Sequence, residues 1–233
     1  MKHETLADGV EIWQGDCLEV MEGMPDKSVD IVLTDSPYGL NTKSSYSGAK
    51  HKVNPWADLI NSAYWYSAWM GECMRIVKDD GCMWTFLNWR SLVTFQKASF
   101  DIQSPIESLL IWDKEWIGPG GSRGLRPSYE MVALFTNPDF AIQDRGIPDI
   151  RRCMWASAKP FHPAEKPVDL LAWLILISTK KGDIVLDPFF GSGSTGVAAI
   201  KQERLIIGIE TNPDYFAIAR KRIKEALMQP RLL

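Results

Sequence analysis

The stretch that decides the fold is IVLDPFFGSGSTG, residues 184–196. Its short apolar start predicts a buried strand that ends at Asp187. A glycine turn follows, and residues 194–202 predict a helix whose first backbone N–H groups can bind a polar ligand. The next strand, 205–210, ends at Glu210, about twenty residues after the turn, where a ribose-binding carboxylate is usual. This unit predicts a site for an adenosine-containing cofactor, with tight helix–strand packing as the alternative.

The glycine spacing leaves the choice of cofactor open. Gly191, Gly193 and Gly196 fit the G-x-G-x-x-G pattern of dinucleotide sites, which keeps NAD as a candidate. However, Asp187 stands directly before the turn, and a carboxylate there suits an amino group better than a pyrophosphate. The sequence therefore favours S-adenosyl-L-methionine, which carries an ammonium and a sulfonium group.

A second apolar strand, 30–34, ends in a motif of another kind. It is followed by Asp35, Ser36, Pro37 and Tyr38. The proline fixes its own φ and restricts the residue before it, so the tip is stiff. Ligands of open α/β sheets bind beyond the carboxyl ends of strands. The tip is therefore a candidate site, and a plain turn is the alternative.

Strands and helices alternate along most of the 233 residues. Strands are predicted at 10–14, 30–34, 82–87, 106–112, 129–135, 184–187 and 205–210, and helices at 17–24, 56–77, 90–98, 167–179, 194–202 and 213–228. This order predicts an α/β fold with a doubly wound, mostly parallel sheet. We expect a single domain, 1–233.

Composition narrows the classes of protein that the chain can belong to. The formal net charge is −3, which excludes a broadly basic nucleic-acid coat but leaves room for a local positive face. Four cysteines without C-x-x-C spacing do not suggest a zinc site, so we expect no metal. With no apolar run of membrane length and no signal peptide, we expect a cytoplasmic protein without a membrane partner.

In combination, the motifs resemble the DNA amino-methyltransferases of bacteria and phages, in the permuted arrangement called the β group. Residues 35–38, DSPY, are similar to the D-P-P-Y-type catalytic motif that comes first in this group, and residues 189–193, FFGSG, to the F-x-G-x-G cofactor motif that comes last. Residues 162–167, HPAEKP, look like an H-P-x-x-K-P segment, and residues 15–17, GDC, like a strand ending in G-D. The resemblance implies a circularly permuted, seven-stranded Rossmann-like methyltransferase sheet with one antiparallel strand.

The resemblance also implies catalytic roles for the tip. Asp35 would accept a hydrogen bond from the exocyclic amine of the target base, and the carbonyl of Ser36 would share this amine. Pro37 would keep the tip stiff. Tyr38 would stack on a base rotated out of the duplex, because an enzyme cannot reach the amine inside the stack.

A larger set of residues is implied to bind S-adenosyl-L-methionine. Asp187 and the glycine turn would hold the methionine part, Glu210 the ribose hydroxyls and Asp16 the adenine. His162 and Lys166 would lie near the methionine carboxylate. The full set is Asp16, Cys17, Asp35, His162, Lys166, Asp187, Pro188, Phe189, Gly191, Gly193, Ser194, Thr195, Glu210 and Thr211.

The resemblance also implies a target base, through the first residue of the tip. The adenine motif of this family has proline where Ser36 stands, whereas cytosine-N4 enzymes usually begin with serine. Aligned on Pro37 and Tyr38, the leading residue is Asp35, which favours adenine-N6 methylation with cytosine-N4 as the alternative. RNA or protein glutamine is an alternative substrate. A nucleotide-binding or DNA-binding module without catalysis is a further alternative, against which the intact tip argues.

Recognition of double-stranded DNA is expected from segments outside these motifs. Residues 39–54 predict a mobile loop, and 113–160 predict an inserted target-recognition segment in which 136–160 is the main candidate. The candidate DNA contacts are Lys50, Lys52, Arg123, Arg126, Arg151 and Arg152. The alternative is a solvated loop, because acidic residues nearly balance the basic ones. A homodimer is also open, since members of the group are often dimers.

Overall fold

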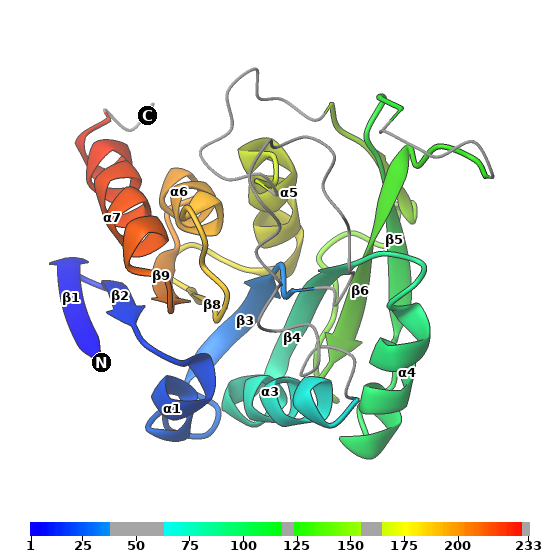
Figure 1. Ribbon diagram of the computed structural model, residues 1–233, viewed down its shortest axis with the longest axis horizontal. Coiled ribbons are helices and arrows are strands. Elements are labelled where there is room, and N and C mark those ends of the chain that lie inside the picture. Colours follow the sequence, from blue (N-terminus) through cyan, green and yellow to red (C-terminus); the bar gives the residue numbers. More distant parts are fainter. Residues whose placement is uncertain (38–62, 118–123, 155–164, 230–233) are drawn as a thin grey trace, which may run out of the picture.

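The computed structural model describes residues 1–37, 63–117, 124–154 and 165–229. Nine strands of these residues form one sheet in the order β1-β2-β9-β8-β3-β4-β6-β5-β7. The strands are β1 (Lys2–Ala7), β2 (Val10–Gln14), β3 (Val29–Thr34), β4 (Val77–Leu87), β5 (Ser108–Asp113), β6 (Tyr129–Thr136), β7 (Ile150–Arg152), β8 (Ile184–Asp187) and β9 (Leu205–Glu210). Figure 1 shows the sheet running across the molecule.

The seven inner strands are those that the sequence predicts. β2, β9, β8, β3 and β4 are parallel neighbours, and β6 lies antiparallel between β4 and β5. The predicted mostly parallel sheet with one antiparallel strand is therefore confirmed for this inner part.

The expected count of seven strands is too low, because each edge carries one more. β1 pairs antiparallel with β2, and β7 pairs parallel with β5. β1 is mostly polar and none of its residues is fully buried, while all of β7 is exposed. Neither has the apolar run or alternation that marks a strand in sequence. β4 also begins at Val77, ahead of the expected 82–87.

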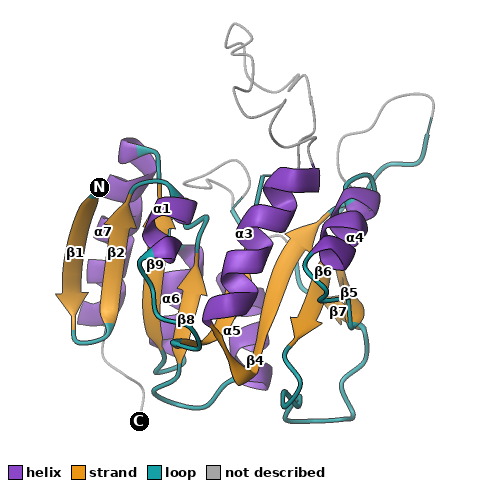
Figure 2. Ribbon diagram, turned by 90° about the horizontal axis from the view of Figure 1, so that it is seen from below, coloured by secondary structure: helices purple, strands orange, loops and turns teal. Residues whose placement is uncertain are grey.

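Helices cover both faces of the sheet, so the predicted doubly wound architecture is confirmed. They are α1 (Cys17–Glu22), α3 (Ala63–Ile76), α4 (Leu92–Asp101), α5 (Val168–Ser178), α6 (Ser194–Lys201) and α7 (Pro213–Met228). Figure 2 shows α1, α3 and α4 in front of the sheet, with α5, α6 and α7 behind it. Each group contributes to its own hydrophobic cluster.

Strand β3 separates the two clusters. Ile31 and Leu33 pack into the cluster under α5, α6 and α7, whereas Val32 faces the cluster under α1 and α3, and all three are fully buried. Burying a side chain of this size stabilises the fold by about 1.5–3 kcal/mol. This explains why the sequence of a strand buried on both faces is a continuous apolar run.

The strand order brings the two ends of the chain together. β8 and β9, which come last in the sequence, lie between β2 and β3, which come first. Val32 of β3 pairs with Leu186 of β8 in parallel register. The motifs that follow these strands therefore leave the same edge of the sheet side by side.

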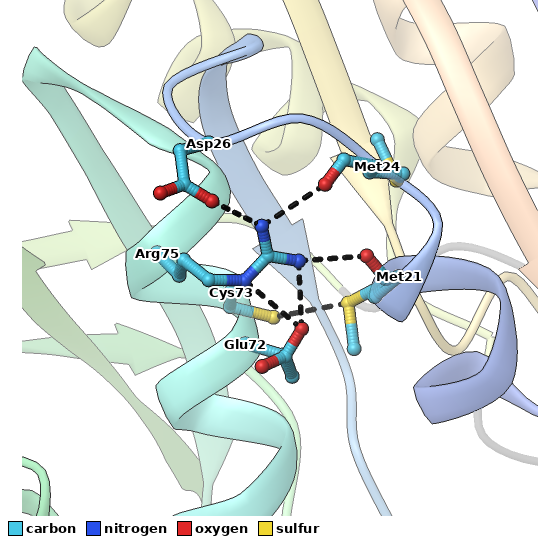
Figure 3. A network of polar contacts seen from close by, with 6 residues as sticks. All are labelled: Met21, Met24, Asp26, Glu72, Cys73 and Arg75. Carbon is cyan, nitrogen blue, oxygen red and sulfur yellow. Dashed lines mark hydrogen bonds and ion pairs between the residues drawn. The ribbon is translucent and has the colours of Figure 1, made fainter.

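A polar clamp holds the short helix α1 against α3 (Figure 3). The Arg75 guanidinium donates to the carbonyls of Met21, at 2.8 Å, and Met24, at 3.0 Å. It also pairs with the carboxylates of Asp26 and Glu72. Since α1 begins directly after the G-D motif, the clamp fixes one border of the site described below.

The segment 113–160 is partly built into the sheet. β6 lies inside it and pairs with both β4 and β5, and β7 lies near its end. The segment predicted to recognise the target thus includes two strands of the sheet, β6 and β7, and its role in recognition stays a prediction.

Candidate active site

A cavity of about 430 Å³ opens where β2, β3, β8 and β9 end. The predicted site residues that line it are Asp16, Cys17, Asp35, Ser36, Pro37, Lys166, Asp187, Pro188, Phe189, Gly191, Ser194, Thr195, Glu210 and Thr211. Gly193 does not line it. Tyr38, Lys50, Lys52, Arg123 and His162 lie outside the described residues, as does the expected loop 39–54.

Asp187 is the most deeply buried carboxylate of the cavity, at 3 % exposed. It accepts hydrogen bonds from the Thr34 hydroxyl, at 2.7 Å, and from the Phe189 backbone N–H, at 3.1 Å. Burial outweighs these bonds and raises the pKa of Asp187 to about 6. A buried carboxylate held near its titration point is well suited to a cationic ligand, which would stabilise the ionised form.

The glycine turn has the left-handed backbone that only glycine adopts at low cost. Gly191 has φ +52° and Gly193 has φ +80°. A Cβ at Gly193 would lie 3.0 Å from the Cβ of Ala219 in α7, so this glycine permits close packing behind the turn. The turn is shaped by both glycines, but only Gly191 faces the cavity.

Glu210 closes the turn from the end of β9. One of its carboxylate oxygens accepts the Gly191 N–H and the other accepts the Asn212 N–H, each at 2.7 Å. Burial raises the pKa of Glu210 even though these N–H groups stabilise its charge. A carboxylate has about four lone-pair positions, so Glu210 keeps capacity for hydroxyl donors in the cavity.

Asp16 and Cys17 form the border at β2. Asp16 caps α1, and its Oδ1 accepts the backbone N–H groups of Leu18, at 2.8 Å, and Glu19, at 3.4 Å. Burial raises the pKa of the Cys17 thiol to about 12, so the thiol is neutral. The backbone N–H of Gly15 donates to the carbonyl of Glu210 at 3.1 Å, which joins this border to β9.

An ion pair between Arg222 of α7 and Glu165 supports the glycine turn, and sequence reasoning did not identify it. The Arg222 guanidinium donates to Glu165, at 2.7 Å, and to the carbonyl of Ser192, at 2.9 Å. The hydroxyl of Ser194 contacts both charged groups. Glu165 belongs to the HPAEKP segment, whereas Arg222 stands among other basic residues of an amphipathic helix, where sequence gives no signal.

The tip after β3 is held by a tyrosine that sequence reasoning also missed. The Tyr66 hydroxyl of α3 donates to the carbonyl of Pro37 at 2.9 Å. Its ring is 1 % exposed and lies 4.5 Å from the ring of Phe95. Ser36 is 2 % exposed, and within the described residues its hydroxyl has no hydrogen-bond partner.

Lys166 lies against the tip that follows β3. Its Nζ is 2.6 Å from Asp35 Oδ2 and 3.2 Å from Glu130 Oε2, and its side chain is 7 % exposed. Burial alone would lower the pKa of Lys166, but the charges of Asp35 and Glu130 outweigh it and raise the pKa. Sequence reasoning expected Lys166 near a ligand carboxylate and did not identify Glu130.

The predicted DNA-contacting arginines that the structure describes lie apart from the cavity. Arg151 places its guanidinium 4.7 Å from the ring centre of Trp173, and the Arg152 Nε is 3.5 Å from Asp113. Arg126 donates to the carbonyl of Ile117 at 3.2 Å.

In the described part of the chain, no three His, Cys, Asp or Glu side chains are grouped as metal ligands, and no helix there could cross a membrane.

Comparisons with known proteins assign the chain that carries these motifs to a family. Residues 29–221 match the N6_N4_Mtase model, described as DNA methylase. The chain is 32 % identical to a putative methylase, YubD, of Escherichia coli over 90 % of its own length and 88 % of that protein. It is 27 % identical to the type II methyltransferase M.HinfI of Haemophilus influenzae, over 99 % of this chain and 73 % of the relative.

A solved structure agrees with this assignment. The complex of M1.HpyAVI with SAM superposes with a TM-score of 0.67 at 25 % identity, covering 91 % of this chain and 98 % of that one. The family model spans most of the chain, including the tip, the glycine turn and Glu210. The protein therefore belongs to the N6/N4 DNA methylase family, whose members methylate DNA with S-adenosyl-L-methionine.

Proposed function

We propose that the protein methylates the exocyclic N6 of adenine in double-stranded DNA, with Asp35 at the reacting amine. One observation carries the proposal: Asp35 lines the same cavity as Asp187 and Glu210, although the three carboxylates come from opposite ends of the sequence. A donor site and an acceptor site for the methyl group would thus share one cavity.

The cavity residues fit S-adenosyl-L-methionine, which supplies the methyl group when it is bound. Asp187 would hold the ammonium, because a cation offsets the burial that raises the pKa of this carboxylate. Glu210 would accept the ribose hydroxyls with its remaining lone pairs, and Asp16 would border the adenine. Gly191 lets the backbone approach closely, since it carries no side chain there.

At the tip, the role of Asp35 is to orient the amine. An exocyclic amine has a lone pair delocalised into the base, and a hydrogen bond to a carboxylate directs that lone pair out of the ring plane. The carbonyl of Ser36 would share the amine. Tyr66 supports this geometry by holding the Pro37 carbonyl. Tyr38 would stack on the base after it leaves the duplex.

The burial of Ser36 supports adenine over cytosine. Ser36 stands where the adenine motif of the family has a proline that stiffens the tip, and this departure is what weakens the adenine assignment. Ser36 is 2 % exposed, whereas the side chain of Asp35 is 24 % exposed and contacts Lys166. This leaves Asp35 as the leading group of the tip.

The proposal is tested with duplex DNA and S-adenosyl-L-methionine labelled in its methyl group. Digestion to nucleosides should yield labelled N6-methyladenine, whereas labelled N4-methylcytosine would establish the alternative. Asp35→Ala should lower the rate at least about 10³-fold, because an interaction that positions the reacting atom is lost. Its affinity for S-adenosyl-L-methionine, measured by calorimetry, should stay within about threefold, since Asp187 and Glu210 remain.

A matched control is Glu225→Gln, which changes an exposed carboxylate on α7. This variant should retain full activity. Equal losses in the two variants, or activity in Asp35→Ala, would refute the catalytic assignment. Binding of S-adenosyl-L-methionine without methylation of any DNA would favour the binding-module alternative.

A further inference from the structure

We propose that Glu130 and Lys114 are positioning residues that hold Lys166, and through it the carboxylate of Asp35, in the geometry needed for methyl transfer. The inference rests on the proposed role of Asp35 and names the groups that support it. Neither Glu130 nor Lys114 lines the cavity.

Four charges of alternating sign form a chain from the tip into the sheet. Asp35 Oδ2 lies 2.6 Å from Lys166 Nζ, which lies 3.2 Å from Glu130 Oε2, and Glu130 Oε1 pairs with Lys114. The side chains of Lys166, Glu130 and Lys114 are 7 %, 19 % and 16 % exposed. Two carboxylates and two ammonium groups thus balance each other in a place where unpaired charges would be costly.

The four residues come from four parts of the fold. Asp35 follows β3, Lys166 precedes α5, Glu130 stands at the start of β6 and Lys114 follows β5. Because β6 runs antiparallel to β4 and β5, its first residues lie at the edge of the sheet where β4 and β5 end. The antiparallel strand thereby brings a carboxylate from its first residues to this edge.

This row of four charges lets Asp35 serve two partners. If Lys166 depended on Asp35 alone, the carboxylate would have to neutralise the buried ammonium and accept the target amine together. Glu130 supplies a second acceptor, so Lys166 stays charged while Asp35 turns one oxygen to the amine. Lys114, whose ammonium lies 5.2 Å from the ring centre of Trp112, engages the other oxygen of Glu130 and fixes its rotamer.

The titration of these groups agrees with the geometry. Burial would lower the pKa of Lys166, but the charges of Asp35 and Glu130 raise it. Burial would likewise raise the pKa of Glu130, but the charges of Lys166 and Lys114 lower it. The charged groups facing Lys166 are Asp35 after β3 and Glu130 on β6. The charge of Asp35 also contributes to the raised pKa of Asp187 at the end of β8. Removing the charge of Glu130 should therefore lower the pKa of Lys166.

The decisive variant is Glu130→Gln, which keeps the shape of the side chain. We expect kcat to fall about 10- to 100-fold, the effect of a small displacement of a positioned group. The KM for S-adenosyl-L-methionine should change less than about threefold. The alkaline limit of activity should move to lower pH, because Lys166 loses its proton earlier. Glu130→Asp should restore part of kcat, and Lys114→Met should reduce kcat less than Glu130→Gln does.

Lys78→Met serves as the control for a lost ion pair. Lys78 pairs with Asp30 at 2.6 Å and is partly buried, but it stands at the opposite end of β4 from the tip. It should lower the urea midpoint of unfolding without changing kcat. A kcat in Glu130→Gln equal to that of the wild type, or a loss matched by Lys78→Met, would overturn the inference.

A readout without turnover separates this inference from the proposed function. In protein labelled with ¹⁵N-lysine, the Nζ resonance of Lys166 should titrate at lower pH in Glu130→Gln than in the wild type. An unchanged titration overturns the inference even if the wild type methylates adenine. Absence of N6-methyladenine from the wild-type reaction refutes the proposed function, whichever way Lys166 titrates.

Discussion

Asp187 couples proton binding to folding at a single residue. Its pKa rises from 3.8 to about 6 on folding. The stability that the protonated carboxyl contributes is therefore fully present below about pH 4 and is lost as the pH rises through 6. Once Asp187 is ionised, the free energy of unfolding is lower by about 3 kcal/mol. Asp187→Asn removes this cost. In the absence of S-adenosyl-L-methionine, the free energy of unfolding of Asp187→Asn relative to the wild type should rise by roughly 1.5 kcal/mol between pH 5 and pH 8.

Urea unfolding of both proteins at the two pH values measures this difference. A difference that does not change with pH would show that Asp187 is not titrating in the folded protein. Asp187→Asn should also bind S-adenosyl-L-methionine more weakly at pH 8, because the variant offers no charge to the ammonium.

Residues at strand ends were predictable, whereas their partners were not. Asp35, Asp187 and Glu210 each follow an apolar run, so a one-dimensional pattern places them at the carboxyl edge of the sheet, and the cavity contains all three. Glu130 and Arg222 reach the site only through the antiparallel course of β6 and the packing of α7. Such neighbours depend on tertiary contacts between segments that are distant in sequence.

Among the elements, α1 depends on the Arg75 clamp more than on its own sequence. A helix of six residues is too short to be stable alone. Arg75→Met removes the guanidinium that donates to the carbonyls of Met21 and Met24, although the Met21 carbonyl still accepts the Met24 N–H. The substitution should lower the free energy of unfolding by about 1–3 kcal/mol. Lys221→Gln, which breaks an exposed pair with Glu225 on α7, should change it by less than about 0.5 kcal/mol.

Urea denaturation followed by tryptophan fluorescence compares the two variants. Equal stability of Arg75→Met and the wild type would mean that α1 is held by its apolar contacts alone. Since Asp16 caps α1, the Arg75 variant should also bind S-adenosyl-L-methionine more weakly.

Elements with strong periodicity were predicted and those at the edges were not. α5 and α7 begin next to Pro167 and at Pro213, the signals from which the sequence places them. β1 and β7 exist because a neighbouring strand offers hydrogen bonds, and their own residues remain exposed or only partly buried. Edge strands of this kind carry no pattern that a sequence can reveal.

For the whole molecule, we propose that DNA lies against the edge where the cavity opens. β7 pairs with the end of β5, so Arg151 and Arg152 stand at that edge, and both are exposed. Replacing both with alanine should weaken DNA binding and reduce the slope of log K against log salt concentration by about one to two.

Fluorescence anisotropy over a range of salt concentrations measures this slope. The control replaces Lys180 and Lys181, which precede β8 at the opposite edge, with alanine. It should keep the wild-type slope. A slope that both double variants leave unchanged would remove β7 from the DNA interface.

The insertion of β8 and β9 between β2 and β3 has a consequence for synthesis on the ribosome. A nascent chain that ends before residue 184 has made both flanks of the sheet but not its centre, so β2 and β3 have no neighbours on their facing sides. Such a chain contains the DSPY tip yet lacks Asp187, the glycine turn and Glu210. If these residues hold the cofactor as proposed, we expect truncated products to be unable to methylate DNA, and methylation to require that the final strands have emerged and closed the gap.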